Sequence, residues 1–154
     1  MKRTIAPTTL VIAFATVFVL GIVPRAQAAD DCSNATLQGS FGYTSTGTLL
    51  PPEAMPPFVG PFAEVGRQTF DGNGHTHATA TLSANGNIVK ATITGTYAVN
   101  PDCTGSMTVN VSPLGITVHA HFVIDDNGAE IRAIVTDSGA VESRVYNKQF
   151  RGDL

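Results

Sequence analysis

Four histidines form two closely spaced pairs that could bind a metal ion. They are His75 with His77, and His119 with His121. On a β-strand, residues i and i+2 point to the same face about 6 to 7 Å apart, a spacing at which two imidazoles can bind one zinc or copper ion. Each pair, however, alternates with the more apolar side of its segment, which indicates that both pairs face solvent. We therefore predict no metal site and no cofactor.

The carboxylates form no evident acid–base pair. Glu64 is the exception among them, because it shares a strand face with Phe62 and Phe70. A buried carboxyl group there would have a raised pKa and would be a candidate acid or ligand anchor, whereas a strand that twists into solvent, which the pattern favours, would leave it exposed. The other carboxylates considered fall in predicted turns, where Asp caps backbone amides: Asp71, Asp102, Asp125, Asp126 and Asp137.

No known nucleophile motif is present. The sequence contains no Gly-x-Ser-x-Gly pentapeptide and no glycine-rich loop before a helix. The two cysteines, Cys32 and Cys103, lack the C-x-x-C spacing of redox and metal sites. We expect one structural disulfide between them, which would stabilise the fold by roughly 4 kcal/mol. No catalytic residue is assigned, and a non-enzymatic protein is expected.

Residues 1–28 have the pattern of a signal peptide. A basic Lys2-Arg3 start precedes a long apolar run, and Ala26-Gln27-Ala28 is a small-residue cleavage site. Cleavage after Ala28 predicts a secreted or periplasmic domain over residues 29–154, with six basic and twelve acidic residues. A net charge of −6 argues against a nucleic-acid partner, and no membrane insertion is expected after cleavage. An uncleaved membrane anchor is the alternative.

The mature part has the composition of an all-β protein. It contains 15 Thr and 11 Val but only 2 Lys, and Asn85-Gly86 is a strong two-residue hairpin signal. Short connections between consecutive strands predict an antiparallel meander, which we expect to close into an eight-stranded up-and-down β-barrel. A two-sheet sandwich is the alternative. The expected strands cover residues 37–47, 62–71, 75–84, 88–99, 104–112, 115–125, 129–137 and 140–150.

The alternation of side chains predicts which residues line the barrel. The expected lining, and the expected ligand contacts, are Phe41, Tyr43, Ile93, Tyr97, Val109, Val118 and Phe122. Residues 140–150 are ambiguous, because Val141 and Val145 face one way and Tyr146 and Phe150 the other. Residues 49–61 hold five prolines and form neither a helix nor a central strand. This segment is interpreted as a packed surface loop or as a lid over one mouth of the barrel.

Three stretches resemble a group of uncharacterised secreted bacterial proteins with an allene-oxide-cyclase-like, lipocalin-like barrel. They are Gly39-Ser40-Phe41-Gly42-Tyr43, Phe70-Asp71-Gly72-Asn73-Gly74 and residues 95–105, Gly-Thr-Tyr-Ala-Val-Asn-Pro-Asp-Cys-Thr-Gly. The resemblance implies a closed antiparallel barrel, and it carries no catalytic residue over to this chain.

Three functions are compatible with these patterns. The leading hypothesis is a secreted, non-enzymatic barrel that binds a small apolar molecule, because an eight-stranded barrel is wide enough to hold one small ligand. A second is an envelope or surface module that acts through its outer face and an unidentified protein partner. A third is an isomerase of the allene-oxide-cyclase type, with Glu64 or a tyrosine hydroxyl as the reacting group.

Overall fold

The computed structural model describes residues 32–54 and 56–149, so the predicted signal peptide lies outside the described residues. Two short 3₁₀ helices accompany eight strands. The helices are η1 (Asn34–Leu37) and η2 (Asp126–Gly128). The strands are β1 (Gly39–Leu49), β2 (Gly60–Phe70), β3 (His75–Ala84), β4 (Asn87–Val99), β5 (Thr104–Ser112), β6 (Ile116–Asp125), β7 (Glu130–Val135) and β8 (Ala140–Lys148).

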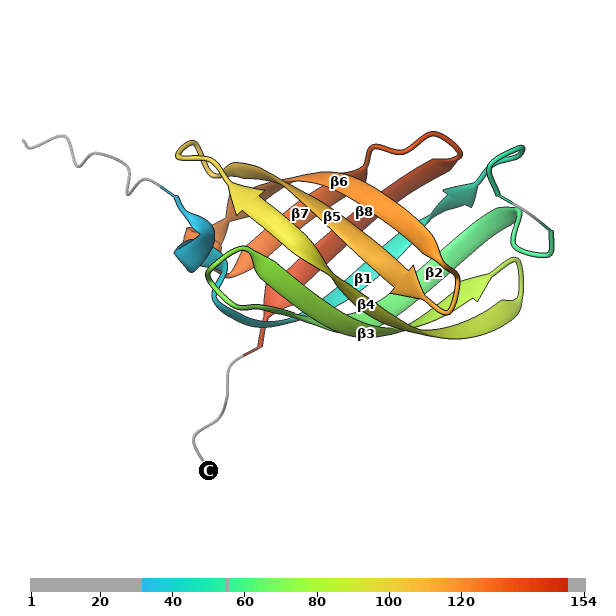
Figure 1. Ribbon diagram of the computed structural model, residues 1–154, viewed down its shortest axis with the longest axis horizontal. Coiled ribbons are helices and arrows are strands. Elements are labelled where there is room, and N and C mark those ends of the chain that lie inside the picture. Colours follow the sequence, from blue (N-terminus) through green and yellow to red (C-terminus); the bar gives the residue numbers. More distant parts are fainter. Residues whose placement is uncertain (1–31, 55, 150–154) are drawn as a thin grey trace, which may run out of the picture.

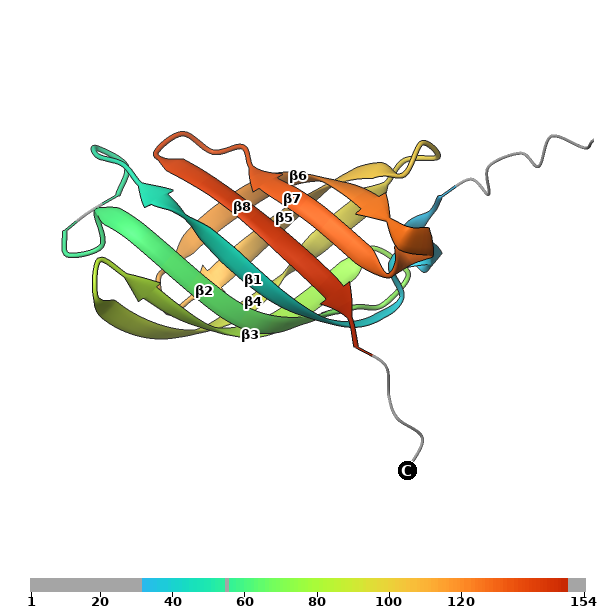
Figure 2. The ribbon, with the colours of Figure 1, turned by 180° about the vertical axis from the view of Figure 1, so that it is seen from behind.

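The eight strands form a closed antiparallel barrel in which each strand pairs with its neighbours in sequence (Figure 1). The barrel closes where β8 pairs with β1, from Phe41 opposite Lys148 to Leu49 opposite Ala140. Figure 2 shows this seam from behind, with β8 lying between β1 and β7. The predicted up-and-down barrel is confirmed, and closure leaves the sheet without a free edge.

The strand ends differ from the prediction by only a few residues. The largest correction concerns Leu37 and Gln38, which were expected to open the first strand. Leu37 instead ends η1, and its fully buried side chain packs into the core. Asn85 and Gly86 have positive φ values of 47° and 82°, as the two-residue turn between β3 and β4 requires.

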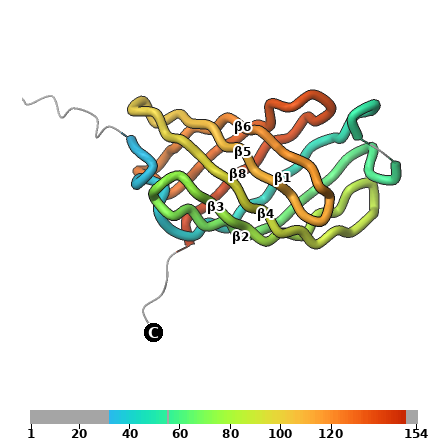
Figure 3. Tube along the Cα trace, viewed as in Figure 1, coloured from blue at the N-terminus to red at the C-terminus, as the bar shows by residue number. Residues whose placement is uncertain are grey.

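One end of the barrel, which we call the capped end, is closed by the N-terminal segment. The predicted disulfide joins Cys32 to Cys103, next to η1 and the turn between β4 and β5. The Cys32 backbone N–H also donates to the Pro101 carbonyl at 3.2 Å. The N-terminal segment is thereby fixed across this end, on the left in Figures 1 and 3.

The opposite end, which we call the loop end, carries residues 50–54 and 56–59 and the turns at 85–86, 113–115 and 136–139 (Figure 3). The proline-rich loop forms hydrogen bonds with the neighbouring turns on both sides of it. Asn85 and Asn87 each donate a side-chain N–H to the Pro57 carbonyl at 3.2 Å, and the Leu50 N–H donates to the Gly139 carbonyl at 2.8 Å. The loop therefore forms part of the rim of this mouth.

Helical structure in residues 32–54 and 56–149 is limited to single turns. Neither η1 nor η2, nor any other helix in the described ranges, is long and apolar enough to cross a membrane.

Candidate functional site

The seven residues expected to line the barrel all lie on its inner wall. Six are buried and Val118 is partly buried, and all seven belong to or pack against one core cluster. Four hollows of about 280 to 690 Å³ in the described residues lie on the outer wall of the barrel. The side chains of the core cluster occupy the middle of the barrel.

Strand β8 reverses the usual distribution of apolar and charged residues. Val141 and Val145 face solvent with 63% and 39% of their surface exposed, while Glu142 and Arg144 point inward and are each only 6% exposed. Tyr146, on the same inward face, is fully buried. Charged residues are almost never buried in this way unless they are paired, so this strand distinguishes the barrel from one with a purely apolar core.

Six inward side chains from β1, β2 and β8 form what we call the inner polar group: Tyr43, Ser45, Glu64, Glu142, Arg144 and Tyr146. Arg144 donates from Nε to Glu142 Oε1, and Ser45 Oγ donates to the same oxygen at 2.7 Å. Tyr43 donates its hydroxyl hydrogen to Glu64 Oε1. The Arg144 guanidinium lies 5.8 Å from the centre of the Tyr43 ring, a cation–π distance that connects the two halves of the group.

Burial shifts the pKa values of the residues in this group. Burial raises the pKa of Glu64, while the Arg144 guanidinium and the Tyr43 hydroxyl act in the opposite direction. The pKa of Tyr43 is raised by burial and by the neighbouring Glu64 carboxylate. Burial disfavours the charge on Arg144, but Tyr146, Glu142 and Glu64 together raise its pKa. Arg144 therefore stays charged inside the barrel.

Tyr146 carries an unsatisfied polar atom. Its hydroxyl is buried and has no partner with regular hydrogen-bond geometry among the described residues, although the Arg144 guanidinium lies close enough to act as a weak donor to it. Burial raises its pKa, an effect opposed by Arg144, and its ring centre lies 5.0 Å from that of Tyr43. Buried hydroxyls nearly always have a partner, so this atom is a point where a bound molecule could make a hydrogen bond.

The register of the strands places polar and apolar residues side by side in one layer of the inner wall. Ser45 lies opposite both Arg144 and Glu64, Glu64 lies opposite Leu82, and Leu82 lies opposite Val89. The layer therefore changes from charged to apolar between β2 and β3. Beyond it, the inner wall contributed by β4 to β7 is built mainly of apolar side chains, including Ala91, Ile93, Met107, Val109, Val111, Ala120 and Ile131.

This layer is partly exposed, although Phe62, Ala84 and Glu142, which lie nearer the loop end on the same strands, are buried. Glu64, Leu82, Val89 and Val118 all point inward and are partly exposed, whereas Phe41, Phe70 and Tyr97 near the capped end are buried. The Phe62 ring packs over Gly47 one layer nearer the rim. Glu64 is the partly exposed member of the inner polar group, and it lies beside an apolar wall.

A glycine allows Tyr43 to reach Glu64. Gly66 points inward opposite Tyr43, and a Cβ at this position would lie 2.5 Å from the Tyr43 ring and 2.7 Å from the Thr79 carbonyl oxygen. The tyrosine ring therefore occupies the space that a side chain at position 66 would fill.

Two expectations about the carboxylates are corrected. The pattern favoured an exposed Glu64, but this residue lies inside the barrel in contact with Tyr43. A second carboxylate, Glu142, also points inward, although no pair of acidic residues was expected. The signal for Glu142 was the strict alternation of β8, which puts Glu142, Arg144 and Tyr146 on one face.

The histidines are exposed, as the alternation predicts. His75 and His77 lie on β3, and His119 and His121 lie on β6. His75 Nδ1 lies 3.2 Å from Asp71 Oδ2, and His119 Nδ1 lies 2.7 Å from Asp137 Oδ1. β3 and β6 are not adjacent in the barrel, and no cluster of three metal-binding side chains occurs in the described part of the chain.

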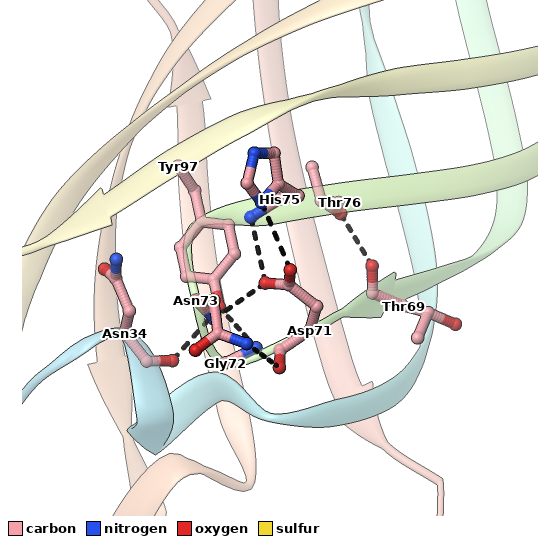
Figure 4. Close-up of polar contacts among 8 residues, drawn as sticks. All are labelled: Asn34, Thr69, Asp71, Gly72, Asn73, His75, Thr76 and Tyr97. Atoms are coloured by element: carbon pink, nitrogen blue, oxygen red, sulfur yellow. Dashed lines mark hydrogen bonds and ion pairs between the residues drawn. The ribbon is translucent and has the colours of Figure 1, made fainter.

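Two of the stretches that carry the family resemblance, residues 70–74 and 95–105, build the capped end, whereas the third, residues 39–43, includes Tyr43 of the inner polar group. Asp71 Oδ1 accepts from the N–H groups of Asn73 and His75 at 2.7 and 2.9 Å. The Tyr97 hydroxyl accepts from the Gly72 N–H at 2.9 Å and donates to the Asn34 carbonyl at 3.1 Å (Figure 4). These contacts join η1 to the turn between β2 and β3, which gives the stretch around Asp71 a structural role.

Comparisons with known proteins support the fold alone. No family model matches the chain, and no curated protein matches it. A solved structure of a redesigned β-barrel is similar, with a TM-score of 0.52 and 13% sequence identity. The match covers 76% of this chain and 95% of that one. At this identity the likeness concerns architecture, so function has to be argued from the inner polar group.

Proposed function

We propose that this protein is a secreted barrel that binds a small, largely apolar molecule through the mouth at its loop end. The observation that carries the proposal is the layer in which Glu64 lies beside Leu82 and Val89, all three inward and partly exposed. Ligand sites are typically apolar surfaces with a few well-placed polar groups, and this layer has that composition. The apolar body of the ligand would contact Leu82 and Val89, and its polar end would contact the inner polar group.

The energetics of the inner polar group support a role beyond stability. Taking charged groups out of water costs several kcal/mol per ion, and well-packed apolar side chains of similar volume often stabilise a protein as well or better. The chain nevertheless carries Glu142 and Arg144 inside and Val141 and Val145 outside. A barrel selected only for stability has no need of this reversal, so we propose that the buried charges serve binding.

The proposal also includes the compartment in which the protein acts and the family to which it belongs. The signal-like N-terminal sequence and the disulfide between Cys32 and Cys103 fit an oxidising compartment, either the periplasm or the cell exterior. We further propose that the chain belongs with the allene-oxide-cyclase-like barrels that it resembles in sequence. The closed eight-stranded barrel agrees with that assignment without being specific to it.

A second candidate function is supported by one contact. Tyr43 and Glu64 form a hydrogen-bonded pair of titratable groups inside the barrel, and such a pair can move a proton during an isomerisation. The binding function is preferred because it requires only the polar and apolar layer. Turnover of a bound molecule that is lost in Glu64→Gln, while binding is kept, would favour the isomerase.

Native mass spectrometry of the mature protein, purified from the secreted fraction of its own host, tests the binding proposal. We expect a protein mass that corresponds to cleavage after Ala28 with the disulfide formed, accompanied by an adduct of a few hundred daltons. Added decanol should displace the bound molecule by competing for the same apolar surface, so the adduct should disappear from the spectrum. A bare mass, with no adduct formed on addition of decanol either, would instead favour a module that acts through its outer face.

A further inference from the structure

The charges of the inner polar group do not balance. The group contains two carboxylates, Glu64 and Glu142, and one guanidinium, Arg144. Glu142 accepts hydrogen bonds from both Arg144 and Ser45. Glu64 accepts its one side-chain hydrogen bond from Tyr43, which is a neutral donor. When both carboxylates are ionised, the group carries one net negative charge, because the two carboxylates share the single Arg144 guanidinium, and Glu64 is the partly exposed carboxylate of the two.

The Tyr146 hydroxyl is a second, independent indication that a molecule binds here. It is fully buried within the inner polar group and has no partner with regular hydrogen-bond geometry among the described residues. Tyr146 lies opposite Tyr43 where β8 pairs with β1, and it shares the inward face of β8 with Arg144 and Glu142. A polar atom of a ligand that contacts Glu64 could also satisfy this hydroxyl.

We propose that the ligand of this barrel is a cationic amphiphile, an apolar molecule with a protonated amine that binds the Glu64 carboxylate. This inference rests on the proposed binding function and specifies the chemical class of its ligand. An ammonium group supplies the missing positive charge and has three N–H donors, so it can bond Glu64 and Tyr146 together. The apolar chain then lies along Leu82 and Val89, which follow Glu64 in register.

An anionic head group fits the same site poorly. Arg144 is the positive residue of the group, and its Nε is already bonded to Glu142. A carboxylate ligand would add a third negative charge to the two already present, next to one guanidinium. Like charges in a water-poor site repel strongly, so a fatty acid should bind more weakly than an amine with the same chain.

The inference is tested by titrating the mature protein with decylamine, decanol and decanoate in a calorimeter at neutral pH. These probes share one apolar chain length and differ in the charge of the head group. We expect decylamine to bind most tightly and decanoate least. Glu64→Gln keeps the shape of the side chain and removes its charge, and it should weaken decylamine binding about tenfold or more while leaving decanol nearly unchanged.

Two further variants separate specific binding from attraction to an acidic protein. Glu53→Gln removes one negative charge from the exposed rim loop, so it matches Glu64→Gln in net charge and should leave decylamine binding unchanged. Tyr146→Phe should weaken decylamine binding with little loss of stability, because the hydroxyl has no partner with regular hydrogen-bond geometry without ligand. Far-ultraviolet circular dichroism establishes that each variant is folded.

The outcomes distinguish the inference from the function on which it rests. Decanoate binding as tightly as decylamine, or equal effects of Glu64→Gln and Glu53→Gln, would overturn the cationic ligand and leave apolar binding intact. Absence of binding by all three probes would overturn the binding function and the inference together. Tight decylamine binding that depends on Glu64 supports both.

Discussion

Glu64 lies opposite Leu82 in the register of β2 and β3, and this pair marks the boundary between the polar and apolar halves of the barrel interior. On one side of Glu64, the same layer continues through Ser45 to Arg144. On the other side of Leu82, it continues to Val89. Both members of the pair point into the barrel and are partly exposed.

Replacing Glu64 should change how stability depends on pH. Burial raises the pKa of Glu64, so the folded protein binds a proton at this site more tightly than the unfolded chain does. The stabilising contribution is therefore present below the ordinary glutamate pKa of 4.5 and is lost as pH rises through the raised value. Glu64→Gln should be more stable than the natural protein in mildly alkaline solution, with a smaller difference in acid.

Urea unfolding of both proteins at several pH values measures this effect, with Glu53→Gln as the control for a carboxylate on the exposed loop. A stability difference between the natural protein and Glu64→Gln that does not grow with pH would show that Glu64 is ionised without cost in the folded state.

Removing Arg144 alone should damage the barrel more than removing the whole ion pair. Arg144→Met leaves the Glu142 carboxylate buried without its charged partner, a situation that typically costs about 3 to 5 kcal/mol. Arg144→Met combined with Glu142→Gln leaves no unpaired charge and should regain much of this loss. A double-mutant cycle from urea unfolding gives the coupling energy. Additive effects of the two substitutions would mean that Glu142 and Arg144 do not depend on each other for stability.

The disulfide should stabilise the fold without contributing to binding. Cys32 and Cys103 are 71 residues apart, and the entropy of closing a loop of this length corresponds to roughly 4 kcal/mol. We expect Cys32→Ala with Cys103→Ala to unfold at a much lower urea concentration, yet to bind decanol with unchanged affinity at low temperature. Loss of affinity in a variant that is still folded would indicate that the capped end shapes the site.

The sequence predicts the barrel itself because its signals are local. Asn85-Gly86 fixes one hairpin, short turns connect consecutive strands, and alternation orients residues such as Ile93 and Val109 inward. Glu64 is also identified from a local signal, because alternation places it on the same strand face as Phe62 and Phe70. The two cysteines predict the disulfide because both the number and the expected compartment favour pairing.

The rest of the inner polar group could not be predicted in the same way. Hydrophobicity places valines inside and charges outside, and β8 does the opposite at Val141, Glu142 and Arg144. The contact between Tyr43 and Glu64 depends on the register of two strands and on the space above Gly66, neither of which is visible in one strand. Partial exposure at Val89 depends on how the loop end is packed, which is a tertiary property.

The most direct test introduces a larger side chain on the inner wall beside Glu64. Val89 points inward and is partly exposed, while the preceding Ile88 points outward with 66% of its surface exposed. The chain contains no tryptophan, so Val89→Trp and Ile88→Trp each introduce one fluorophore at matched positions. Leu82→Phe, with Thr81→Phe as its outward control, gives a second pair of variants should Val89→Trp fold poorly.

The decisive measurement is the affinity of each variant for decanol, determined by calorimetry and by tryptophan emission. The account predicts that Val89→Trp and Leu82→Phe weaken binding about tenfold or more, whereas Ile88→Trp and Thr81→Phe bind as the natural protein does. Equal binding by the inward and outward variants would contradict a site at the loop end and would place any ligand on the outer wall.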